Sequence, residues 1–118
     1  MLRRRLSGSS VSMTNQEYLH LADACLDRVA NWLEGLDPEE VDYSTTDGMV
    51  SLDFPDGKKF VLNRQSGNSQ MWLAAGVRAW HYNWSPESQA WLDDKDQHEL
   101  YARIAEVVGE KIGRTVTL

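Results

Sequence analysis

The sequence predicts an α+β fold, a two-layer α/β sandwich with N- and C-terminal helices packed on one face of a five- to six-stranded antiparallel sheet. Amphipathic segments with the helical period of about 3.6 residues stand at both ends of the chain. Between them the apolar residues alternate with a period of about two, which is typical of half-buried strands. The links between these strands are short, so consecutive strands should pair as antiparallel neighbours and leave one sheet face to solvent.

The first helix is expected to begin at a capping box, because Thr14 and Glu17 have the spacing at which each side chain can bond the other's backbone amide. Gly35 is a typical residue for its end. At 100° per residue, one arc of this helix collects the apolar side chains Tyr18, Ala22, Cys25, Leu26, Val29, Trp32 and Leu33. The opposite arc collects His20, Asp23, Asp27, Asn31 and Glu34.

Strands are expected over residues 41–44, 49–54, 58–64, 70–74, 79–84 and 89–92. The hairpin of residues 58–74 turns at residues 66–69. Asp94 and Gln97 are a second capping signal, and Gly113 should end the helix that follows. The apolar face of that helix comprises Leu100, Ile104, Val107, Val108 and Ile112. We expect the tail, residues 115–118, to pack back onto the body.

The 118 residues are 42% hydrophobic and 25% charged, which is the composition of an ordinary globular domain. The net charge is −6, and without Arg3, Arg4 and Arg5 the chain has 9 basic against 18 acidic residues. Such a body repels nucleic acid and anionic membranes, so cations or basic protein surfaces are the expected partners. A single cysteine excludes an internal disulfide framework and disfavours a cysteine-based zinc site.

Residues 1–12 are rich in arginine and serine and contain no acid, which is the composition of an organellar transit peptide. A disordered tail or a cloning remnant is the alternative. We therefore expect a tail or transit-peptide remnant over residues 1–13 and a single domain over residues 14–118.

Residues 17–42 contain eight carboxylates and one arginine. We call these carboxylates the acidic ridge: Glu17, Asp23, Asp27, Glu34, Asp37, Glu39, Glu40 and Asp42. A solvated helix face is the simple interpretation, yet like charges four residues apart cost a helix about 0.2–0.5 kcal/mol. Carboxylates are hard ligands for iron, manganese, calcium or magnesium, and along an exposed ridge they would form weak, multiple and poorly selective sites. His20 could add one nitrogen ligand, although a lone exposed histidine usually has no such role.

Trp72 should point away from the core, because its neighbours Met71 and Leu73 are expected to point inward. It lies among the polar residues Asn63, Arg64, Gln65 and Gln70. It is either a partly covered surface tryptophan or a protein-binding hot spot, since Trp and Arg carry a large share of interface energy. The sequence contains no Gly-rich phosphate loop, HExxH motif or EF-hand spacing, and no catalytic residue is predicted.

The run Asn-Arg-Gln-Ser-Gly-Asn-Ser-Gln-Met-Trp-Leu-Ala at residues 63–74 resembles the signature of the frataxin family, mitochondrial and bacterial. The resemblance extends from Gln16 to about Gly113 and includes the acidic first helix. Three features depart from the family pattern: Gly67 stands where proline is usual, Asn31 stands where an acid is common, and the region of residues 75–82, which contains Arg78, is shorter than usual.

This resemblance implies an iron-binding protein that regulates iron–sulfur cluster assembly by binding the cysteine desulfurase–scaffold complex, with possible delivery of Fe(II). It implies weak, multiple Fe2+/Fe3+ sites on the acidic ridge and His20. The partner-binding residues that it implies are Asn63, Gln65, Gln70, Trp72 and Arg78.

Two other functions stay open. One is a ferroxidase or iron store that oligomerises with iron, and the other is an acidic adaptor with no metal role. We expect a monomer without iron, in the mitochondrial matrix or a related organelle, or alternatively in the bacterial cytoplasm.

Overall fold

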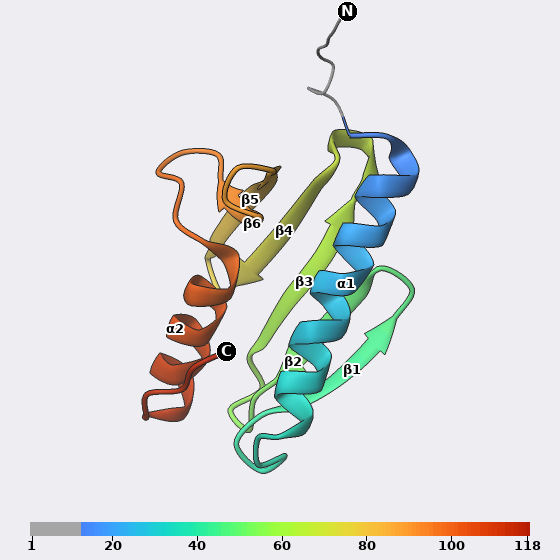
Figure 1. Ribbon diagram of the computed structural model, residues 1–118. Helices are drawn as coiled ribbons and strands as arrows, with labels where there is room; N and C mark the ends of the chain where they lie inside the picture. Colours follow the sequence, from blue (N-terminus) through green and yellow to red (C-terminus); the bar gives the residue numbers. More distant parts are fainter. Residues whose placement is uncertain (1–12) are drawn as a thin grey trace, which may run out of the picture.

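The computed structural model describes residues 13–118, and the predictions for residues 1–12 lie outside this range. Helix α1 (Asn15–Glu34) precedes the strands and helix α2 (Leu100–Ile112) follows them (Figure 1). The strands are β1 (Asp42–Thr46), β2 (Met49–Asp53), β3 (Lys59–Gln65), β4 (Gln70–Ala75), β5 (Arg78–Ser85) and β6 (Ala90–Asp93). A single 3-10 turn, η2 (Ser66–Asn68), joins β3 to β4.

The strands form one antiparallel sheet in the order β1-β2-β3-β4-β5-β6, so each strand pairs with its neighbour in sequence. Both helices lie on the same face of this sheet (Figure 1). The predicted two-layer α/β sandwich is therefore confirmed, with six strands. The first strand lies slightly later than expected, at residues 42–46.

The capping box at the start of α1 is formed as predicted. The Glu17 amide donates to Thr14 Oγ1 at 3.0 Å, and the Thr14 amide donates to Glu17 Oε1 at 2.8 Å. The predicted apolar arc is buried except at Trp32, which is only partly covered. Trp32 Nε1 donates to the Thr117 carbonyl at 2.8 Å, so this side chain fastens the C-terminal tail to the body.

The predicted cap of the second helix was wrong, because α2 is capped by Glu99 and not by the Asp94–Gln97 pair. The buried Asp93 carboxylate accepts the Lys95 and Asp96 amides and so forms a tight turn before the helix. Glu99 then pairs with Leu92 as an extended residue, and the helix begins only after this bridge.

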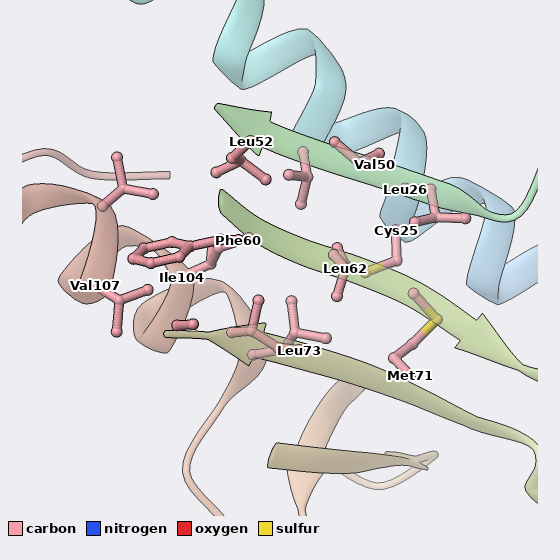
Figure 2. Close-up of a cluster of buried hydrophobic side chains, with 14 of the residues drawn as sticks. Cys25, Leu26, Val50, Leu52, Phe60, Leu62, Met71, Leu73, Ile104 and Val107 are labelled. Atoms are coloured by element: carbon pink, nitrogen blue, oxygen red, sulfur yellow. The ribbon is translucent and has the colours of Figure 1, made fainter. Parts of the chain in front are cut away.

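The core lies between the sheet and the two helices (Figure 2). Figure 2 shows the side chains of Cys25 and Leu26 from α1 and of Ile104 and Val107 from α2 among those of the central strands. Val116 and Leu118 of the tail pack against this core. A Cβ at Gly109 would lie 2.7 Å from the Arg114 carbonyl oxygen, so the return of the chain after α2 requires glycine there.

None of the described helices combines the length and the apolar character that crossing a membrane requires.

Candidate protein-binding platform and acidic ridge

The sheet face without helices presents two rows of side chains across β3, β4 and β5. Asn63, Trp72 and His81 lie in register in the first row, and Gln65, Gln70 and Asn83 lie in register in the second. Their neighbours Met71, Leu73 and Tyr82 are buried, and strand side chains alternate, so all six point away from the core. We call these six residues the platform.

The orientation of Trp72 is fixed by two neighbours on the platform. Its Nε1 donates to Gln70 Oε1 at 2.9 Å. Its ring stacks on the His81 imidazole, with 4.2 Å between ring centroids and 15° between planes. Gln70 in turn donates through Nε2 to Asn83 Oδ1 at 3.2 Å. The indole is therefore held in place before any partner arrives, which reduces the entropy lost on binding.

The platform is also attached to α1 from behind. The Tyr18 hydroxyl, which belongs to a fully buried residue, donates to the Gln70 carbonyl at 2.8 Å. Burial raises the pKa of Tyr18, so the phenol stays protonated and remains a donor. Helix and platform thus share a fixed contact at the start of β4.

The structure separates Arg78 from the other residues predicted to bind a partner. Arg78 pairs with the buried Ala75 and therefore projects from the helix-facing side of the sheet. Its guanidinium lies 5.3 Å from the Trp80 ring centroid, and its Nη2 lies 3.3 Å from Glu110 Oε1 on α2.

The β5 residue beside Trp72 is His81, which the sequence interpretation had not assigned to this surface. A signal for it existed. Gly76 and Val77 form a two-residue turn, and counting pairs outward from Ala75–Arg78 places His81 opposite Trp72.

Arg64, which the sequence placed beside Trp72, projects from the opposite face. It pairs with the buried Met71, so its side chain extends toward α1. Its Nη1 lies 2.5 Å from Asp23 Oδ1, and its Nη2 lies 3.2 Å from Asp47 Oδ1 in the β1–β2 turn. The ridge therefore has a cationic partner from β3, which the sequence of residues 17–42, with eight carboxylates and one arginine, did not indicate.

Several other ridge carboxylates also have partners. Arg114 donates through Nη2 and Nε to the two oxygens of Glu40, at 2.8 and 3.1 Å, and this hydrogen bonding lowers the pKa of Glu40. The Tyr43 hydroxyl donates to Glu34 Oε1 at 2.5 Å. Asp37 accepts the Glu39 amide, Asp42 the Tyr43 amide, and Glu17 belongs to the capping box.

The ridge does not form a closed metal cage. Within residues 13–118, no three ridge residues, nor His20 with two of them, bring ligand atoms within 4.8 Å of one another. The one group of this kind in that range is Asp93, Asp96 and His98, outside the ridge. An open groove of about 480 Å³ lies between α1 and the β1–β2 hairpin, lined by Asp23, Asp27 and Asp47 among others. Cations held here would meet single carboxylates and water.

The structure thus combines a small α/β sandwich, a fixed aromatic–amide platform on the sheet face without helices, and an open carboxylate ridge on α1 and the segment after it. The chain belongs to the frataxin family, because the frataxin-like domain model matches residues 11–114.

Named relatives support this assignment. The chain is 33% identical over 104 residues to the iron-sulfur cluster assembly protein CyaY of Delftia acidovorans, covering 86% of this chain and 93% of the relative. With CyaY of Ralstonia pickettii it shares 28% identity over 109 residues, covering 90% and 95%.

Solved structures of the family have the same fold. Frataxin from Psychromonas ingrahamii superposes with a TM-score of 0.80 at 26% identity, covering 89% of this chain and 97% of that one. Trimeric frataxin from Saccharomyces cerevisiae, complexed with ferrous iron, gives a TM-score of 0.70 at 25% identity, covering 80% and 87%.

Proposed function

We propose that this protein regulates iron–sulfur cluster assembly by binding the cysteine desulfurase–scaffold complex through the platform. The observation that carries this proposal is Trp72, a large aromatic side chain fixed by Gln70 and His81 on an uncovered sheet face. Aromatic anchors of this kind dominate the binding energy of protein interfaces. Relatives named as iron-sulfur cluster assembly proteins support a partner within the iron–sulfur assembly machinery.

The acidic ridge supports a second part of the proposal, the binding and delivery of Fe(II). Iron is cargo in this scheme. An exposed ridge without a cage suits weak, multiple and rapidly exchanging Fe2+ or Fe3+ sites, because water completes each coordination shell. The same negative charge would steer the ridge toward a basic surface of the partner.

The bacterial origin of the named CyaY relatives favours the bacterial cytoplasm over the mitochondrial matrix as the location of this function.

The test is a binding titration against a purified cysteine desulfurase–scaffold complex. Trp72→Ala should weaken binding by about thirtyfold, the equivalent of a hot spot of about 2 kcal/mol. His81→Ala should weaken it by about fivefold, because it removes the stacked neighbour of the indole and about 1 kcal/mol.

Arg78→Ala is the matched control, since Arg78 lies on the opposite face of the sheet. Wild-type affinity in this variant is expected. Undiminished binding by Trp72→Ala would refute the platform as the docking surface, and an equal loss in Arg78→Ala would show that the partner contacts the other face.

A ferroxidase or iron-storage function that requires oligomers is a second possibility, and the trimeric yeast frataxin with ferrous iron favours it. Oxidation in such a site needs neighbouring irons, so the sites would have to form between subunits. Anaerobic loading with Fe2+ followed by oxygen, with sedimentation before and after, tests it. Oxidation no faster than in buffer, by a protein that stays monomeric, would eliminate this function.

A further inference from the structure

Arg64 belongs to strand β3 of the platform and reaches the acidic ridge. It stands in β3 between Asn63 and Gln65, both on the platform, while its guanidinium contacts Asp23 on α1 and Asp47 in the β1–β2 turn. Asp47 lies outside the ridge in sequence, but it lines the same groove as Asp23 and Asp27 and shares the guanidinium with Asp23.

The Arg64 side chain is much less exposed to solvent than the side chains of the two aspartates that it contacts. The Arg64 side chain is 20% exposed, against 53% for Asp23 and 93% for Asp47. The turn is shaped around it, since a Cβ at Gly48, where φ is +80°, would lie 3.2 Å from Arg64 Cζ. The Arg64 amide also donates to the Gly48 carbonyl at 3.0 Å. The side chain is thus part of a packed contact, with less freedom than a mobile surface pair.

The charge of Arg64 is secure in this position. Burial alone would lower its pKa, but the hydrogen bond to Asp23 and the charges of Asp23 and Asp47 raise it above the usual value. A permanent cation therefore already occupies an oxygen of Asp23 to which a metal ion would bind.

We infer that the Arg64 guanidinium competes with metal ions for the Asp23 carboxylate and thereby sets the metal affinity of the ridge at Asp23. This inference rests on the proposed iron-binding function of the ridge. A divalent cation at Asp23 must compete with the guanidinium for the carboxylate, whose Oδ1 the guanidinium already contacts, while Asp27, which has no such partner among the described residues, stays open to the first ion. Loading of Asp23 thereby loosens a side chain of the platform strand itself.

The test uses Mn2+, which broadens nearby amide NMR signals and does not oxidise in air. In the full chain at low salt, Arg64→Gln should strengthen Mn2+ binding at Asp23 by about two- to fivefold, the range expected for releasing one partly exposed ion pair. Affinity at Asp27 should change less.

Arg28→Gln is the matched control. Arg28 also lies on α1, next to Asp27 in the sequence. Its guanidinium, however, lies 4.5 Å from the Tyr101 ring centroid and pairs with no carboxylate among the described residues. The substitution Arg28→Gln removes the same positive charge as Arg64→Gln but leaves the ion pair of Asp23 intact. An equal gain in Arg28→Gln and Arg64→Gln would show that net charge alone acts, and would overturn the inference.

A measurement on the wild type covers the case in which Arg64→Gln does not fold. On titration with diamagnetic Mg2+, the Arg64 Nε–H signal should shift with the same midpoint as the Asp23 amide. A side-chain signal that stays unchanged while the Asp23 amide shifts would overturn the inference and leave iron binding intact. No metal response at the ridge in any variant would refute the inference and the iron part of the proposed function, while platform binding would still be decided by the Trp72→Ala titration.

Discussion

The platform and the acidic ridge are built in opposite ways. On the platform, each row contains one residue from each of the three hydrogen-bonded strands β3, β4 and β5. Trp72 is fixed there by ring stacking and by a hydrogen bond. On the ridge, some carboxylates line an open groove and others lie in the segment after α1. Those that form ion pairs do so separately, each with an arginine from another element. A fixed surface suits recognition of one partner's shape, whereas scattered charges suit ions that bind weakly and leave quickly.

The largest expected effect separates the platform from the core beneath it, because adjacent residues of β4 point to opposite faces of the sheet. Leu73→Ala should destabilise the fold by about 2–5 kcal/mol, because Leu73 is 1% exposed and its loss leaves a cavity. Trp72→Ala should cost about 1 kcal/mol or less, since the indole faces outward and loses mainly its contact with His81. Urea unfolding followed by circular dichroism measures both.

The comparison breaks down if the two substitutions cost the same. A loss above about 2 kcal/mol in Trp72→Ala would mean that the tryptophan supports the sheet, and its effect on partner binding would then no longer report on docking.

Local features were predictable from the sequence, whereas features set by register were not. The capping box and the alternation around Trp72 depend on residues a few positions apart, and both are confirmed. The face on which Arg78 lies was not predictable, because the face of a β5 residue depends on the turn at Gly76, where a shift of one residue exchanges the faces.

Long-range charge pairing was equally invisible in the sequence. Arg64 is 41 residues from Asp23, and Arg114 is 74 from Glu40. Charge counted along residues 17–42 therefore overstated the isolation of the ridge, since both arginines come from other elements. The cap of α2 was missed for a related reason, because Asp93 forms a turn over the expected cap residues and the chain becomes helical only after the extended residue Glu99.

Asp23 and Asp27, the two ridge aspartates on α1, should respond in opposite directions to the same substitution. Asp27→Asn should stabilise the fold by about 0.2–0.5 kcal/mol, because it removes a like-charge pair four residues apart. Asp23→Asn relieves the same repulsion but also ends the ion pair with Arg64, whose screened value of at most about 1 kcal/mol should outweigh that gain. Thermal unfolding at low salt and again at high salt measures the difference.

Both shifts should shrink at high salt, since these are partly exposed charges. Stabilisation by Asp23→Asn as large as by Asp27→Asn would show that the Arg64 contact contributes nothing and that the ridge behaves as a plain repulsive cluster.

The smallest effect concerns Glu17, the first ridge carboxylate, which its own helix already uses. The hydrogen bond with the Thr14 backbone lowers the pKa of Glu17 below the usual 4.5. A carboxyl group with a lowered folded-state pKa stabilises the fold fully above its unfolded pKa, and this contribution is lost as pH falls through the folded value. Wild type should therefore be more stable than Glu17→Gln at neutral pH, and the difference should disappear as the pH falls through the lowered folded-state pKa of Glu17.

Urea unfolding of the two proteins at several pH values measures this difference, in which groups common to both cancel. A difference that persists below the folded pKa would assign it to amide geometry, because the charge is then gone. The expected loss would instead place Glu17 with Asp23 and Glu40 among the ridge acids that the fold itself employs. Under the proposed iron-binding function, Asp27, which has no side-chain partner among the described residues, would then remain open to iron in the groove that α1 forms with the β1–β2 hairpin.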